Sequence, residues 1–83
     1  MLTSEQIRAA KAMLRWSGDQ LGREAGVSLS SIRRVEACSG VPEGQNIKTL
    51  MAIRHALESA GIEFIGSPDD RPGVRLNWTA SSN

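Results

Sequence analysis

The stretch GDQLGREAGVSLSSIRRVEA, residues 18–37, carries the clearest structural signal in this chain. It predicts two short helices. Leu21 and Ala25 lie four residues apart on the first, and Ile32 and Val35 lie three residues apart on the second. Gly26 ends the first helix, since glycine readily adopts the left-handed conformation found at helix ends. Only residues 26–28 connect the helices. Two helices joined this closely cannot lie antiparallel, so they must cross steeply.

The inner surface of this pair carries the residues that a helix-turn-helix unit needs. These are a small residue where the helices touch, a glycine at the turn and branched apolar residues on the second helix. The residues that meet these needs and complete the small core are Leu21, Gly22, Gly26, Val27, Ile32 and Val35. Glycine at the contact position costs about 1 kcal/mol of helix propensity relative to alanine.

Capping residues define the helices before and within this unit. Thr3 and Gln6 are spaced so that each side chain satisfies a free backbone N–H at the start of a helix over residues 4–15. Ser17 and Gln20 repeat the spacing at the start of the next helix, and Ser28 caps the third helix.

The second half of the chain predicts one more helix and then a change of period. Asn46 caps this fourth helix and Gly61 ends it. Residues 62–65 and the alternating residues 74–78 predict two strands, and the turn-rich residues 66–73 connect them. The expected fold class is therefore mainly α, with four helices followed by a short C-terminal β-hairpin or strand pair.

Composition excludes several classes of protein. The 83 residues suit one small domain, and 40% hydrophobic with 23% charged residues suits a soluble globular chain. Ten Lys or Arg against nine Asp or Glu give a net charge of +1, so any argument for nucleic-acid binding must rest on where the charges lie. The chain has neither a signal-peptide pattern at its start nor an apolar run of about 20 residues. We therefore expect a cytoplasmic protein without a membrane partner.

No constellation of residues indicates catalysis. The sequence has no Gly-x-Ser-x-Gly elbow and no base placed to activate a serine. His55 has no second ligand at metal spacing, so we expect it at the surface, and the lone Cys38 is expected to be half-buried. The sequence thus predicts no enzyme activity, no cofactor and no small-molecule substrate.

The helix over residues 28–37 presents a candidate nucleic-acid surface. Residues 25–35 contain no acidic residue, whereas they include two arginines and three serines. A helix that begins with serines offers N–H groups and hydroxyls to a phosphate or a base edge, and its width suits the major groove. Leu29 and Arg33 share one line of this helix, and Ser30 and Arg34 share the neighbouring line. Both lines are expected to face away from the core.

The same residues resemble the XRE-type helix-turn-helix family, the lambda-repressor and Cro class of bacterial and phage DNA-binding proteins. The matching residues are Trp16-Ser17, Leu21-Gly22, Ala25-Gly26-Val27-Ser28 and Ser31-Ile32-Arg33-Arg34-Val35-Glu36. The family's five-helix pattern maps onto residues 3–60 with its fifth helix missing. We therefore expect a helix-turn-helix DNA-binding domain over residues 1–61, with the motif at 17–37, a C-terminal strand extension over 62–78 and a disordered tail over 79–83.

The resemblance also implies which residues contact DNA. They are Ser17, Ser28, Leu29, Ser30, Arg33 and Arg34. Leu29, Ser30 and Arg34 match base-reading positions, and the others lie near phosphates or flanking bases. Arg34 is the main candidate, because a guanidinium pairs bidentately with guanine and discriminates by about 1–3 kcal/mol. The chain departs from the family pattern at Gly18, where members often have Gln or Glu, so only the backbone and Ser17 can bind a phosphate there.

Lys11 and Glu36 form a further family-like pair, a base on the first helix and an acid at the end of the third. We expect the pair to fix the recognition helix. The alternative is two unconnected surface charges, since an exposed ion pair contributes only about 0–1 kcal/mol.

The last strand carries an apolar face, Val74, Leu76 and Trp78, that needs cover. Either the fourth helix or a second subunit could supply it. We expect a symmetric homodimer, because two recognition helices about 34 Å apart match successive major grooves. The alternative is a monomer whose tail packs locally or frays.

The sequence therefore predicts a transcriptional regulator, acting as repressor or activator, that binds double-stranded DNA sequence-specifically. The alternative is a protein–protein interaction module on the same scaffold, such as an antitoxin or an adaptor. The near-neutral charge and the apolar Leu29 at the start of the recognition helix favour that alternative.

Overall fold

The computed structural model describes residues 2–42, 44 and 46–77. The helices are α1 (Ser4–Leu14), α2 (Gly18–Ala25), α3 (Leu29–Glu36) and α4 (Ile47–Ser59). The antiparallel strands β1 (Ile62–Ser67) and β2 (Asp70–Leu76) follow. This order confirms the predicted four helices with a C-terminal strand pair. Within the described part of the chain, every helix is too short or too polar to cross a bilayer.

Each helix begins at its predicted polar cap. Thr3 and Gln6 form the complete reciprocal pair at α1, and the side chains of Ser17, Ser28 and Asn46 accept backbone N–H groups at α2, α3 and α4. These bonds satisfy N–H groups that have no partner inside the helix, which fixes where each helix starts. At α2 the predicted reciprocal pair is only half formed among the described residues: the Ser17 side chain accepts from the Gln20 N–H, but the Gln20 side chain does not bond back to the Ser17 backbone.

α1 ends one residue earlier than predicted. Arg15 adopts the left-handed conformation, with φ 57° and ψ 33°, and its N–H donates to the carbonyls of Ala12 and Lys11. The chain therefore turns sharply at Arg15, and α2 begins only three residues later at Gly18.

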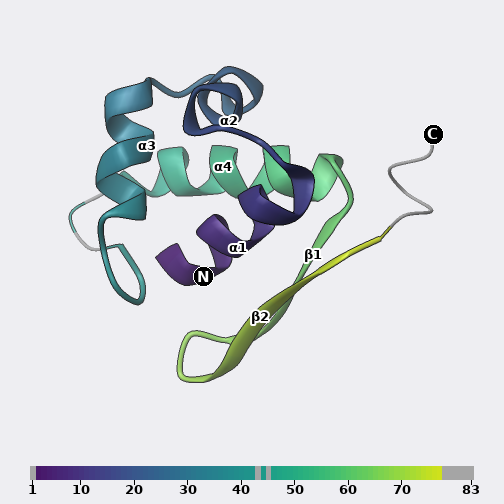
Figure 1. Cartoon of the computed structure of the whole chain (residues 1–83). Helices are drawn as coiled ribbons and strands as arrows, with labels where there is room; N and C mark the ends of the chain where they lie inside the picture. Colours follow the sequence, from purple (N-terminus) through teal and green to yellow (C-terminus); the bar gives the residue numbers. More distant parts are fainter. Residues whose placement is uncertain (1, 43, 45, 78–83) are drawn as a thin grey trace.

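The core lies where the four helices and the start of β1 meet. Its buried residues are Leu2, Ile7, Ala10, Leu21, Ile32, Val35, Leu50, Ile53, Leu57 and Ile62. Figure 1 shows α4 running across the middle of the molecule, with α1 and α2 on either side and α3 at one end. Trp16, in the α1–α2 connection, packs partly buried against this cluster.

α2 and α3 cross steeply, as the short connection between them predicts. In Figure 1 α2 is seen nearly end-on while α3 lies along the plane of the view. Gly26 ends α2 in the left-handed conformation, with φ 70°. The buried Gly22 touches the connection: a Cβ there would lie 2.7 Å from the backbone oxygen of Val27. Glycine at position 22 is therefore a requirement of the packing.

The strands are longer than predicted. The sequence predicts a loop over residues 66–73, but pairing continues from Ile62–Leu76 to Ser67–Asp70, around a turn at residues 68–69. The register shifts at Gly66, whose φ is 75° and where a Cβ would collide with the oxygen of Arg71. Glycine and proline suggest a loop in sequence, yet a bulge in a two-stranded sheet accommodates both residue types.

The hairpin packs on helices of the same chain. β2 lies against α1 and β1 lies against α4. Val74 and Leu76 are half-buried against the core, so the helix that partly covers the predicted apolar face is α1 rather than α4. Trp78, the third residue of that face, and the predicted tail over 79–83 lie outside the described residues.

Gln6 fastens the hairpin to α1. Its side chain is buried; Oε1 accepts from the Thr3 N–H at 2.8 Å, and Nε2 donates to the oxygens of Ile65 at 3.2 Å and Gly73 at 2.9 Å. One side chain thus completes the N-terminal cap of α1 and bridges both strands next to the bulge.

Gln6→Met is expected to destabilise the folded chain by about 1–2 kcal/mol, because methionine keeps the volume but leaves two strand carbonyls and one N–H without their partner. The measurement is urea unfolding followed by circular dichroism. Gln20→Met is the control, since Gln20 occupies the equivalent position of α2 and its backbone N–H makes the same capping bond, to Ser17, but within the described residues its side chain makes no hydrogen bond. Equal losses in the two variants would contradict the role assigned to Gln6.

Candidate nucleic-acid interface

The outer face of α3 carries the polar residues that the sequence predicts there. Ser30, Arg33 and Arg34 are exposed. On the opposite side, Ile32 and Val35 are fully buried in the core. α3 therefore presents one hydroxyl and two guanidinium groups to solvent from a helix that is firmly packed behind them.

Hydroxyl groups organise the first turn of α3. The Ser28 Oγ accepts from the Ser31 N–H at 3.3 Å and donates to the Ser31 Oγ at 3.0 Å. The Ser30 Oγ lies 3.3 Å from the Ser28 Oγ. Arg34 Nη2 donates to the Ser31 Oγ at 3.3 Å. Because a guanidinium has five N–H donors, this bond orients Arg34 along the helix and leaves most of its donors for another partner.

Leu29 does not lie on the free outer line as predicted. It is half-buried, and its Cδ1 lies 3.5 Å from the position that a Cβ would take on Gly18. A Cβ on Gly18 would be in ordinary van der Waals contact with Leu29, so Leu29 is half-buried because it lies beside the start of α2. The sequence marks Gly18 as a departure from the family pattern, and the structure shows that this glycine sits against α3.

The start of α2 lies beside α3. A Cβ on Gly18 would contact Leu29, Ile32 and Glu36 at 3.5–3.6 Å. Ser17, the preceding residue, is exposed, and its Oγ accepts a hydrogen bond from the Gln20 N–H at 3.1 Å. The structure thus brings Ser17 close to the helix that carries the other predicted contact residues.

The predicted ion pair between α1 and α3 is present. Lys11 Nζ lies 2.6 Å from Glu36 Oε1, and the two side chains are only 22% and 15% exposed. Partial burial reduces screening by solvent, so this pair is worth more than a fully exposed one.

Two further side chains of α1 hold the end of α3, and sequence reasoning missed both. Ser4 Oγ is buried and donates to the Val35 oxygen at 2.6 Å. The Arg8 guanidinium donates to the oxygens of Glu36 and Cys38. The last carbonyls of a helix lack partners within it, so these bonds cap α3 from outside. The sequence signal was weak: a polar residue, Ser4, on the side of α1 that faces the core.

The start of α1 also fixes the residues after α3. The N–H of Gly40 donates to Glu5 Oε1 at 3.0 Å, and its oxygen accepts from the Ser4 N–H at 2.8 Å. Hydrogen bonds from its own backbone N–H and from Gly40 lower the pKa of Glu5, which keeps this exposed carboxylate charged. α1 therefore positions α3 and the segment that leaves it.

Among the residues that the structure describes, the arginines of α3 have no acidic partner. The chain has ten Lys and Arg residues. Six of them pair with a carboxylate: Arg8, Lys11, Arg23, Arg54, Arg71 and Arg75. The other four, for which the described part of the chain shows no carboxylate within 4 Å, are Arg15, Arg33, Arg34 and Lys48. The near-neutral total thus conceals a local excess of positive charge on α3.

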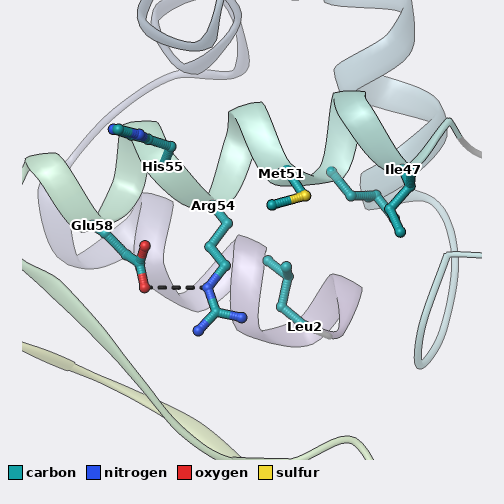
Figure 2. Close-up of a pocket in the computed structure, with 7 residues that line it drawn as sticks. Leu2, Ile47, Met51, Arg54, His55 and Glu58 are labelled. Carbon is teal, nitrogen blue, oxygen red and sulfur yellow. Dashed lines mark hydrogen bonds and ion pairs between the residues drawn. The ribbon is translucent and has the colours of Figure 1, made fainter.

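A second surface feature lies on α4. Figure 2 shows a hollow, of about 380 Å³, lined by Leu2, Ile47, Leu50, Met51, Arg54, His55 and Glu58. Met51 and Ile47 are 64% and 57% exposed, one helical turn apart. Arg54 and Glu58 point toward each other and pair at 3.2 Å. His55 lies at the surface, as predicted.

Comparison with known proteins adds no family assignment. No family model matches the chain, and no curated protein matches it significantly. The evidence for a function therefore comes from α3 and the residues around it.

Proposed function

We propose that this protein is a transcriptional regulator of the lambda-repressor-like helix-turn-helix class. It reads sequence in the major groove of double-stranded DNA with residues 28–37. One observation carries the proposal: Ser30, Arg33 and Arg34 are exposed on α3, and neither arginine has a carboxylate partner among the described residues. A positively charged helix face backed by a packed core suits insertion into the groove.

The contacts divide by chemistry. Arg34 and Ser30 read base edges, and Arg34 pairs bidentately with a guanine. Arg33, Ser28 and Ser17 bind phosphates, which set the position of the helix but carry no sequence information. Leu29, being half-buried, offers only the outer part of its side chain to a thymine methyl group.

The protein acts as a cytoplasmic homodimer in this proposal, because two copies of α3 about 34 Å apart would occupy successive major grooves. The half-covered strand residues Val74 and Leu76 support strand-mediated pairing, and Trp78 continues their alternation in the sequence. Sedimentation equilibrium should give twice the chain mass. A monomer at all concentrations up to that which saturates DNA would reject the dimer.

Selection from a random duplex library tests the proposed function. A conserved half-site should emerge, and its affinity should fall linearly with salt on logarithmic axes, because each neutralised phosphate releases counterions. Equal affinity for every sequence at about 100 mM salt would exclude specific readout.

Binding of another protein is the second candidate function, as an antitoxin or adaptor. The observation that favours it is the exposed pair Ile47 and Met51 beside the hollow on α4, since apolar side chains at a concave surface are typical of protein interfaces. A stoichiometric protein partner lost in Met51→Gln but retained in Arg34→Ala, together with no DNA retardation, would favour this function over the first.

A further inference from the structure

Two residues other than glycine have a left-handed backbone in the described chain, Arg15 with φ 57° and Arg71 with φ 50°. This conformation is uncommon for a residue with a Cβ, whereas glycine adopts it without strain. Both arginines are exposed. Stability alone would therefore favour glycine at either position.

The two arginines differ in their charge partners. Arg71, at the end of the hairpin, pairs with Asp70 at 3.1 Å. Arg15 has no carboxylate within 4 Å in the part of the chain that the structure describes. Strained backbone positions cluster at binding sites, so a strained position that keeps an unpaired charge points to a partner outside the chain.

The backbone around Arg15 is held firmly. Its own N–H bonds to α1, and the N–H of Trp16 donates to the Lys11 oxygen at 2.9 Å while the Trp16 ring packs on the core. The surrounding structure thus imposes the left-handed turn, and it sends the side chain of Arg15 into solvent.

Arg15 lies between two residues that contact α3. Lys11, four positions earlier, pairs with Glu36 at 2.6 Å. Gly18, three positions later, lies so close to α3 that a Cβ added to it would be 3.6 Å from the Glu36 carboxylate. Ser17, a proposed phosphate contact, is two positions away. Arg15 therefore lies in the connection that also carries Ser17 and leads into the start of α2 beside α3.

We propose that Arg15 binds a DNA phosphate beside the base pairs that α3 reads. This inference rests on the proposed function and adds to it a contact from the α1–α2 junction. A guanidinium suits a phosphate because its N–H groups match the phosphate oxygens in geometry and charge. A phosphate contact raises affinity for all sequences alike, so Arg15 contributes to binding strength and not to sequence preference.

Arg15→Gly and its matched control Arg71→Gly test the proposal on the selected duplex. Both variants replace an exposed left-handed arginine by glycine, so both are expected to keep or raise the melting temperature, by up to about 4 °C. Only Arg15→Gly should weaken binding, by about 3–10-fold near 100 mM salt, and reduce the logarithmic salt slope by about 0.9. Its selected sequence should be unchanged. Arg15→Lys, which retains the charge, should keep the wild-type slope.

The outcomes separate this proposal from the proposed function. Wild-type affinity and salt slope in a folded Arg15→Gly variant would overturn the Arg15 contact while leaving readout by α3 intact. An equal loss of affinity in Arg71→Gly would also overturn it, because the effect would then be general. If the wild-type chain binds no duplex at all, the proposed function fails and the Arg15 contact fails with it.

Discussion

Gly22→Ala is expected to destabilise the folded chain by about 2–3 kcal/mol, although alanine is the better helix former by about 1 kcal/mol. The new Cβ would lie 2.7 Å from the Val27 oxygen, and that oxygen belongs to the backbone, which cannot turn aside as a flexible side chain can. The same connection is already held by the Val27 N–H, which donates to the Gly22 oxygen at 2.8 Å. The turn between α2 and α3 must therefore shift. Urea unfolding measures the loss.

Gly18→Ala is the matched control for this prediction. Gly18 opens the same helix, but the nearest atoms to its Cβ position are 3.5–3.6 Å away, which is ordinary van der Waals contact. We expect the stability of this variant to stay within about 0.5 kcal/mol of the wild type. A gain in stability for Gly22→Ala, or equal losses in both variants, would contradict the packing of α2 against the α2–α3 connection.

Arg34→Ala is expected to lower affinity for the selected duplex by about 10–100-fold and to abolish the preference at one base pair. A bidentate arginine–guanine contact contributes about 1–3 kcal/mol of discrimination, and each 1.4 kcal/mol is a factor of ten. Arg34 is exposed, and its described partner is the neutral Ser31 hydroxyl, so little within the chain competes with a base. The measurement is competition binding with duplexes that differ at single base pairs.

Two other arginines provide controls for the loss at Arg34. Arg33→Ala should weaken binding to all sequences by a similar factor and lower the salt slope, as expected for a phosphate contact. Arg75→Ala removes an exposed arginine of β2 that pairs with Glu63 at 3.1 Å, and it should change neither quantity. Retention of the full base preference by Arg34→Ala would disprove its role as a base reader.

The helices could be predicted from sequence because their signals are local. The capping bonds of Ser17 and Ser28 each join residues three apart, and that of Asn46 joins residues two apart, so the pattern is visible in a short stretch of sequence. Gly26 marks the end of α2 for the same reason. The steep crossing of α2 and α3 then follows from the length of the connection.

The contacts by which α1 positions α3 and the hairpin could not be predicted in the same way. Ser4 and Arg8 bind backbone oxygens about 30 residues away, and Gln6 binds strand oxygens 59 and 67 residues away. Every residue has a carbonyl oxygen, so such partners leave no pattern in the sequence. Only the Lys11–Glu36 pair, which joins two side chains of opposite charge, had a recognisable signal.

The hairpin and Leu29 show a second reason for the limits of sequence reasoning. Gly66 and Pro72 interrupt the strand pattern, yet a bulge lets pairing continue past them. Leu29 has a helical position that points partly outward, but its side chain lies against the start of α2 at Gly18. The strand pairing depends on the partner strand, and the burial of Leu29 depends on α2; neither neighbour can be identified from the local sequence.

In the proposed complex, the outer face of α3 contacts DNA bases. The most direct test is a titration of the ¹⁵N-labelled chain with the selected duplex, followed by the amide chemical shifts of every residue. The largest shifts should fall on Ser17 and on residues 28–34, with little change around Met51 on α4. Shifts confined to the Met51 region, or none at an equimolar ratio of duplex to chain, would contradict base contact by α3.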